Sequence, residues 1–329
     1  MDWTKQKVLV TGAGGFIGSH LTEALLDKGA DVTAMIRYTS SSNWGNLEFL
    51  SREQKDKLHV IAGNIEDSDF VSHHVKGKNI VFHLAALITI PYSYIAPLSY
   101  VRTNIEGTLN VMESARKFDI DRVIHTSTSE AYGTALYTPI DEKHPLQGQS
   151  PYSASKIGAD KITESYHLSF ELPVTIIRPF NTFGPRQSAR AVIPNIISQA
   201  FTQKDIHLGS LDPVRDLTYV KDTVQGFIKI VESSKTIGET INVGFGKGIT
   251  ISELAKTILS LMECKKPIIQ KSERFRPITS EVYNLICDNT KAQKLFGWKC
   301  THSLEDGLTD TIEFISKNLG MFKPGTYAL

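Results

Sequence analysis

A tyrosine and a lysine one helical turn apart, in Tyr152-Ser-Ala-Ser-Lys156, are the residues of this chain best suited to hydride chemistry at a sugar carbon. A tyrosine that takes the hydroxyl proton as hydride leaves must ionise near neutral pH, although its unperturbed pKa is about 10. Lowering that pKa to about 7 requires roughly 4 kcal/mol. An ammonium about 4 Å away supplies roughly that much at an effective dielectric of about 20. The pair therefore indicates oxidation of a carbon that bears a hydroxyl group.

Glu130, in Ser127-Thr128-Ser129-Glu130-Ala131-Tyr132-Gly133, adds a second base 22 residues before Tyr152. A carboxylate at this position can remove a proton from the carbon beside a newly formed ketone. Together these residues indicate oxidation followed by elimination.

A glycine-rich segment near the start, Lys7-Val-Leu-Val-Thr-Gly-Ala-Gly-Gly-Phe-Ile-Gly18, follows a short apolar run and opens an amphipathic pattern. Gly12 suits a tight turn, Gly15 a close approach to a diphosphate, and Gly18 close packing of a helix. The amino terminus of that helix, at Phe16 and Ile17, offers free N–H groups to the anion. The segment predicts a dinucleotide site.

The Gly-x-x-Gly-x-x-Gly spacing, together with the Tyr-Lys pair, resembles the extended short-chain dehydrogenase/reductase family. Further segments in family order carry the resemblance along nearly the whole chain: His83-Leu-Ala-Ala86, Arg178-Pro-Phe-Asn-Thr-Phe-Gly-Pro-Arg186, Arg215-Asp-Leu-Thr-Tyr-Val-Lys-Asp222, Asn242-Val-Gly244 and Leu295-Phe-Gly-Trp298. The resemblance implies a doubly wound α/β fold and a nicotinamide cofactor.

The triplet Thr128-Ser129-Glu130 resembles that of nucleotide-sugar 4,6-dehydratases, and most closely that of the GDP-mannose 4,6-dehydratases. The resemblance implies that Tyr152 and Lys156 oxidise C4 while Thr128 binds its oxygen. Glu130 then removes the C5 proton, hydroxide leaves C6, and hydride returns to C6. Relatives with Thr-Asp-Glu use the aspartate to protonate the leaving hydroxide. Ser129 is a poor acid, so Glu130 or a water takes that role here.

Three alternatives remain open. UDP-glucuronate decarboxylases share the triplet and would need an arginine, Arg186 or Arg190, for the substrate carboxylate. Nucleotide-sugar 4-epimerases of the family need no second base. An NADP-binding regulatory protein would not need Thr128, Tyr152 and Lys156.

Cofactor choice depends on Ile36-Arg37-Tyr38-Thr39-Ser40, after the second expected strand. A carboxylate there binds the ribose diol of NAD. Arg37 instead suits a 2′-phosphate, and Ser40 adds a hydroxyl, so the segment favours NADP, with NAD possible. The family's other cofactor contacts correspond to Asn64, Ile65, Leu84, Ala85 and Ala86.

The carboxy-terminal half is expected to hold a nucleotide-diphosphate sugar, such as the GDP-hexose GDP-N-acetylglucosamine. Arg215 and Arg276 have planar guanidinium groups that can each donate paired hydrogen bonds to phosphate oxygens. Asn181 can donate to the diphosphate or sugar, Val192 lines the nucleotide slot, and Arg186 is a further candidate.

Composition fits a soluble enzyme: 329 residues, 41% hydrophobic, net charge +1. This small net charge does not indicate binding to nucleic acid or to anionic membranes. The three cysteines form no Cys-x-x-Cys pair, and we expect no metal and a cytoplasmic location. The helices expected at 104–117 and 152–170 carry more apolar positions than one core-facing stripe needs. These positions predict a homodimer or a dimer of dimers. They are Leu109, Val111, Met112, Ile157, Ile162 and Tyr166.

Alternating strand and helix patterns predict a doubly wound parallel sheet. Strands are expected at 8–11, 32–36, 58–62, 80–83, 123–127 and 174–178, with another ending near Asn242. Helices are expected at 17–28, 69–75, 104–117 and 152–170. We assign 1–183, with about 213–244, to the dinucleotide-binding domain and 184–329 to an interleaved, smaller substrate domain.

Overall fold

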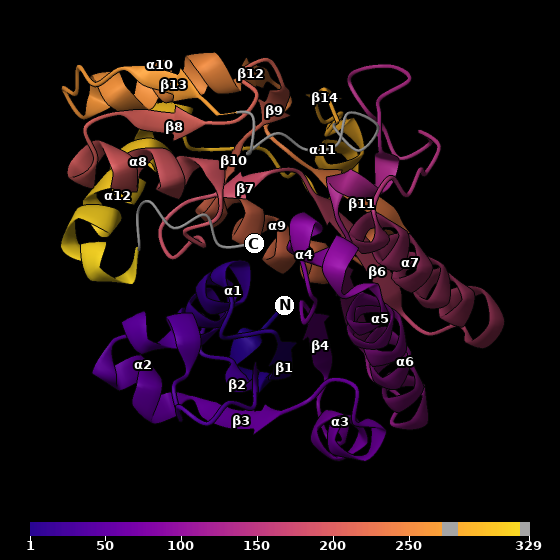
Figure 1. The fold of residues 1–329 in the computed structure, drawn as a ribbon. Coiled ribbons are helices and arrows are strands. Elements are labelled where there is room, and N and C mark those ends of the chain that lie inside the picture. The colour runs from indigo at the N-terminus through magenta and orange to yellow at the C-terminus, as the bar shows by residue number, and fades with distance from the viewer. Residues whose placement is uncertain (272–281, 323–329) are drawn as a thin grey trace.

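A seven-stranded parallel sheet forms the centre of the computed structural model, which describes residues 1–271 and 282–322 (Figure 1). Its order is β11-β6-β5-β4-β1-β2-β3, and neighbouring strands are parallel throughout. The strands are β1 (Lys7–Thr11), β2 (Asp31–Arg37), β3 (His59–Gly63), β4 (Ile80–His83), β5 (Arg122–Thr126), β6 (Val174–Pro179) and β11 (Thr240–Val243). The predicted α/β fold is confirmed, and β11 is the expected strand at Asn242.

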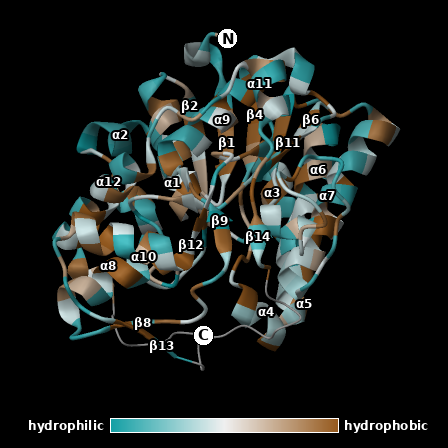
Figure 2. Cartoon of the chain, turned by 90° about the horizontal axis from the view of Figure 1, so that it is seen from above, coloured by the Kyte–Doolittle hydropathy of each residue, from teal (hydrophilic) through white to brown (hydrophobic). Residues whose placement is uncertain are grey.

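Helices cover both faces of the sheet, so both faces are buried and the strands are apolar on both sides. On one face, Val8 and Val10 of β1 join a core that includes α1 (Phe16–Asp27) and α9 (Val220–Glu232). On the other, Leu9 joins a core formed with α3 (Ser68–Val75), α6 (Gly107–Lys117) and α7 (Pro151–Phe170). Figure 2 shows the sheet strands as predominantly hydrophobic beneath more polar helices.

The region before α6 differs from the single helix predicted at 104–117. The chain forms α4 (Ile90–Ile95), α5 (Pro97–Tyr100) and a π-helix (Val101–Glu106) before α6 begins. Pro97 limits the continuation of α4 because proline lacks the N–H that a helix interior requires. A short helix, α2 (Arg52–Lys57), was also missed, although Ser51 and Gln54 form a capping box at its start.

The carboxy-terminal half also forms small sheets and further helices, most of which lie beyond the carboxyl ends of the main strands (Figure 1). The pairs are β7 (Thr182–Phe183) with β10 (Thr218–Tyr219) and β8 (Ile206–Leu208) with β13 (Ile268–Gln270), and β9 (Val214–Asp216) lies between β12 (Gly248–Thr250) and β14 (Asn284–Leu285). The helices are α8 (Val192–Thr202), α10 (Ile251–Leu261), α11 (Thr290–Phe296) and α12 (Leu304–Lys317). The chain thus leaves the main sheet after β6 and returns at β11, whereas the assignment of residues to two domains stays a prediction. Within the described ranges, we find no helix with the length and hydropathy of a membrane span.

Candidate active site

The glycine turn after β1 forms a cradle that side chains would fill. Gly12 has φ +70°, and a Cβ there would lie 2.8 Å from the backbone of Leu84 and Ala85. A Cβ on Gly18 would lie 2.3 Å from the Gly12 carbonyl oxygen, which explains how α1 approaches the turn. Gly15 is the N-cap of α1 and, having no side chain, leaves the first N–H groups of Phe16 and Ile17 without a side-chain cap. These features fit the diphosphate of a dinucleotide.

His83 joins the turn at Leu84-Ala85 to the glycine turn. Thr108 Oγ1 donates to the Asn104 carbonyl (2.6 Å), so it accepts from His83 Nε2 (3.0 Å). His83 Nδ1 therefore accepts from Thr11 Oγ1 (2.8 Å), whose oxygen in turn accepts from the N–H groups of Leu84 and Ala85. This arrangement requires a neutral imidazole, and burial accordingly lowers the pKa of His83 well below its usual value. The predicted cofactor residues Leu84, Ala85 and Ala86 thereby lie beside Gly12.

The residues expected at the adenosine end lie at the edge formed by β2 and β3. Arg37 and Ser40 are exposed, and Arg37 is in register with Gly63. Asn64 is exposed and its side chain accepts from the Glu66 N–H (3.2 Å), whereas Ile65 is buried against α6. The structure thus leaves Arg37 accessible to a ligand, and its role stays a prediction.

The first turn of α7 positions Tyr152 and Lys156. Ser150 and Ser153 form a capping box, and Pro151 begins the helix. Four-residue spacing places Tyr152 and Lys156 on one side of α7, and both are buried, at 7% and 4% exposure. The ring of Tyr100 packs edge-on against that of Tyr152 with 6.3 Å between centroids.

In the protein alone, burial dominates the protonation of this pair. It raises the pKa of Tyr152 well above its usual range, and the Thr128 side chain acts in the opposite direction. Burial also lowers the pKa of Lys156 to about 8, while the charge of Asp160 raises it. Burial thus shifts the pKa of Tyr152 in the opposite direction to the lowering that was predicted from Lys156.

Thr128, Ser129 and Glu130 lie where β5 ends and a short 3-10 helix (Ser129–Tyr132) begins. Thr128 caps that helix by accepting from the Glu130 N–H (3.2 Å). Ser129 is buried, and Glu130 is half-buried. The charge of Glu130 raises the pKa of Tyr152, so the carboxylate acts on the same small region as the tyrosine.

Asn104 belongs to the site but was not recognised from the sequence. It lies in the π-helix and is 1% exposed. Its Oδ1 accepts from the Leu87 N–H (2.8 Å), and its Nδ2 donates to the Leu87 carbonyl (3.0 Å) and to Ser155 Oγ (2.9 Å). Asn104 thus ties the segment after β4 to α7, and an asparagine inside an expected helix was the available signal.

The expected substrate residues occupy different environments. Asn181 Nδ2 is buried and has no hydrogen-bond partner among the described residues. Arg186 has φ +66° and pairs with Glu23 of α1 (Nη2–Oε2 2.8 Å). Arg215 is buried on β9 and Val192 begins α8. Arg276 lies outside the described residues.

The parallel sheet, the glycine turn and the buried Tyr-Lys pair are features of the short-chain dehydrogenase/reductase class. The chain belongs to the GDP-mannose 4,6 dehydratase family, whose model matches residues 9–311.

Similar proteins cover nearly its whole length. A mouse dTDP-D-glucose 4,6-dehydratase is 30% identical over 332 residues, covering 98% of this chain and 92% of the relative. A dTDP-glucose 4,6-dehydratase from Streptomyces venezuelae, solved with NAD and TYD bound, superposes with a TM-score of 0.87 at 27% identity, over 96% and 99% of the two chains. An epimerase from Methanothermobacter thermautotrophicus superposes with a TM-score of 0.88 at 28% identity, over 97% and 95%. The chain is thus an enzyme of the nucleotide-sugar dehydratase and epimerase group.

Proposed function

We propose that this protein is a nucleotide-sugar 4,6-dehydratase that makes a 4-keto-6-deoxy sugar nucleotide. The observation that carries the proposal is that the 3-10 helix bearing the half-buried Glu130 packs against α7, the helix that bears Tyr152. Oxidation at C4 requires one base, and elimination across C5 and C6 requires another. Thr128 lowers the pKa of Tyr152, which suits the two side chains to hold the C4 oxygen between them.

Each side chain has one task in this reaction. Tyr152 takes the C4 hydroxyl proton while Lys156 supplies a cation nearby. A nicotinamide cofactor, which the glycine turn and the amino terminus of α1 would hold, would supply hydride transfer from C4 and back to C6. Glu130 removes the C5 proton and passes it to the departing C6 hydroxide, since the Ser129 hydroxyl is a poor acid, and C5 regains a proton from solvent when hydride returns to C6. The 4-ketone makes the C5 proton acidic enough for a carboxylate.

The relatives support this chemistry and one alternative. Both dTDP-glucose dehydratases and UDP-glucose epimerases are similar to this chain, and an epimerase would use Tyr152 and Lys156 without Glu130. The half-buried carboxylate favours dehydration. The decarboxylase alternative needs an arginine for a substrate carboxylate. Arg186 is already paired with Glu23, whereas Arg190 is exposed and stays a candidate. A regulatory role would leave the buried Tyr-Lys pair without a purpose.

We further propose a GDP-hexose, such as GDP-N-acetylglucosamine, as substrate and NADP as cofactor. The motif Thr128-Ser129-Glu130 supports the first, and the exposed Arg37 at the end of β2 supports the second. The relatives' own names give dTDP and UDP sugars, so the nucleobase of the substrate must be tested directly.

We also propose a homodimer or a dimer of dimers formed through α6 and α7. The prediction that Val111, Met112 and Tyr166 contribute to that surface is wrong, because these side chains are buried in the protein's own core. Leu109 remains 37% exposed, and nearby apolar side chains are exposed as well: Leu98, Val101, Leu168 and Phe170. Light scattering at micromolar concentration should show more than a monomer.

The direct test incubates the protein with GDP-N-acetylglucosamine, GDP-mannose, dTDP-glucose, UDP-glucose and UDP-glucuronate in turn, each with NADP and with NAD. Mass spectrometry should show loss of water from one hexose, with solvent deuterium at C5 and no net cofactor consumption. Carbon dioxide release would instead identify a decarboxylase. An isomer of unchanged mass would identify an epimerase.

A further inference from the structure

Behind Lys156, a buried ion-pair cluster connects α7 to the strands of the sheet. Asp160 lies one turn after Lys156 and is 1% exposed. Its Oδ2 accepts from Ser127 Oγ (2.7 Å) and from Arg178 Nε and Nη2 (3.2 and 2.8 Å). Its Oδ1 lies 3.3 Å from His125 Nε2. The carboxylate is therefore held by residues of β5 and β6 and of the segment after β5, and four-residue spacing places Asp160 on the same side of α7 as Lys156.

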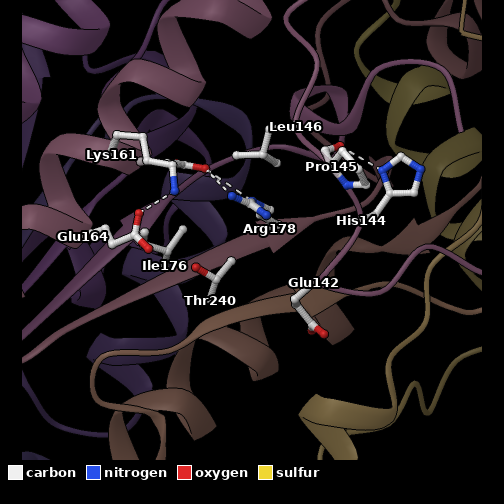
Figure 3. Close-up of a pocket in the computed structure, with 10 residues that line it drawn as sticks. Glu142, His144, Pro145, Leu146, Lys161, Glu164, Ile176, Arg178 and Thr240 are labelled. Carbon is white, nitrogen blue, oxygen red and sulfur yellow. Dashed lines mark hydrogen bonds and ion pairs between the residues drawn. The ribbon is translucent and has the colours of Figure 1, made fainter. Parts of the chain in front are cut away.

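Arg178 completes the cluster and is itself fixed. Its Nη1 donates to Tyr132 Oη (3.0 Å), which in turn donates to Asn242 Oδ1 of β11 (2.7 Å). Arg178 and Asp160 line a cavity of about 410 Å³ between α7, β6, β11 and the 142–146 loop. Figure 3 shows Arg178 in the wall of this cavity, with Lys161, Glu164 and Glu142 around it. The ion pair thus forms part of the wall of this cavity.

The charges of the cluster can be counted. Lys156 and Arg178 carry one positive charge each and Asp160 carries one negative charge, whose hydrogen bonds and positive neighbours hold its pKa at about 2. His125 faces the cluster from β5 and His83 faces it from β4, and burial keeps both neutral by lowering the pKa of His125 to about 4 and that of His83 well below its usual value. The buried set therefore has a net charge of +1, which matches a single anion at Tyr152.

We propose that Asp160 is a positioning residue that keeps Lys156 charged at neutral pH and so sets the pH window of the hydride step. Without a carboxylate one turn away, a lysine at 4% exposure would lose its proton more readily. Asp160 acts on Tyr152 in the same sense, since its negative charge raises the tyrosine pKa as well. Glu130 and Tyr100, the other titratable groups that face Tyr152, also raise it.

The direction of the effect follows from these signs. Hydride removal needs a protonated Lys156 beside Tyr152, so activity should fall as the pH rises past the pKa of Lys156. Asp160→Asn should lower that pKa, because it removes a negative charge and leaves Arg178 unpaired. The pH at which activity falls should therefore move to a lower value.

The experiment measures the lysine itself. In protein labelled with ¹³C at lysine Cε, the Lys156 signal, assigned by its loss in Lys156→Met, should titrate near pH 8. In Asp160→Asn its midpoint should fall by about 1–3 pH units. Glu164→Gln is the matched control, because Glu164 is on the same helix but pairs with the exposed Lys161 (2.6 Å), and it should leave the midpoint unchanged. An unchanged midpoint in folded Asp160→Asn would overturn the proposal.

A second variant guards against misfolding. Asp160→Asn combined with Arg178→Met removes the buried guanidinium that would otherwise lack its partner. Its Lys156 midpoint should still lie below that of the native protein, and a native midpoint would also overturn the proposal. The role of Asp160 in the hydride step depends on the proposed function being right. The Lys156 midpoint measured by NMR does not depend on it. A lowered midpoint without dehydratase activity would therefore refute only the proposed function.

Discussion

The two halves of the proposed ligand-binding region differ in whether backbone or side chains form them. The proposed cofactor half is formed mainly by backbone, since side chains at Gly12 and Gly18 would collide with the neighbouring backbone. The proposed substrate half would depend on side chains from distant segments, such as Asn181 after β6 and Arg215 on β9. A backbone site is specified by short local motifs, whereas a side-chain site is specified only once the chain has folded.

The largest expected effect comes from a variant that distinguishes the roles of the two proposed bases, Tyr152 and Glu130. Glu130→Gln keeps the shape of the side chain but removes the base, so elimination should slow by roughly 10²–10⁴. Oxidation should survive, because Tyr152 and Lys156 remain. Reduced nicotinamide and 4-keto hexose should therefore accumulate transiently in stopped-flow absorbance and mass spectra. Tyr152→Phe is the contrasting variant and should abolish both signals. Undiminished dehydration by Glu130→Gln would falsify its role and leave Ser129 or a water as the base.

The next effect concerns the one side chain on which cofactor choice depends. If Arg37 binds a 2′-phosphate, Arg37→Ala should weaken NADP binding by about 1.5–3 kcal/mol, the range for hydrogen bonds to charged groups, and barely change NAD binding. Calorimetric titration with both cofactors measures the difference. Arg52→Ala, at an exposed arginine that begins α2, controls for loss of surface charge. Equal losses for both cofactors, or tighter NAD binding by the native protein, would contradict the assignment.

A single methyl group should disturb the backbone-built half. Gly18→Ala places a Cβ 2.3 Å from the Gly12 carbonyl, so the turn must shift. We expect a loss of about 1–3 kcal/mol in the free energy of unfolding, measured by denaturant titration, together with weaker cofactor binding. Gly320→Ala is the control, because a Cβ at Gly320 meets nothing within 4 Å among the described residues. Equal stability of the two variants would show that the turn adapts freely.

The same contrast explains what could be predicted from sequence. The six expected strands were located to within one residue at each end, because each is a short, largely apolar run between turn signals. Five of these strands are mainly buried, whereas β3 is a partly exposed edge strand. The glycine turn and the Tyr-Lys pair are local patterns as well. The π-helix before α6 was missed because it depends on Asn104 reaching Leu87 and Ser155, contacts that span 17 and 51 residues.

The electrostatics of the site were beyond sequence reasoning for a related reason. The pKa expected for Tyr152 took account of Lys156 but not of the burial contributed by Tyr100 and Ile90. Arg186 could be named as a candidate ligand for phosphate or carboxylate, but its pairing with Glu23 joins segments far apart in the chain. Such pairings follow from tertiary structure, so composition and spacing do not reveal them.

The smallest expected effect tests the side-chain-built half. Asn181 Nδ2 is buried without a hydrogen-bond partner among the described residues, a cost that a ligand acceptor would relieve. Asn181→Ala should therefore weaken nucleotide-sugar binding by about 0.5–1.5 kcal/mol, the worth of one hydrogen bond, and raise KM with little change in kcat. Asn181→Asp sharpens the test, because an anion in that place repels a diphosphate and should weaken binding more than alanine does. If the aspartate variant binds as well as the native protein, Asn181 does not face the diphosphate, and its unpaired donor must serve the sugar or the fold instead.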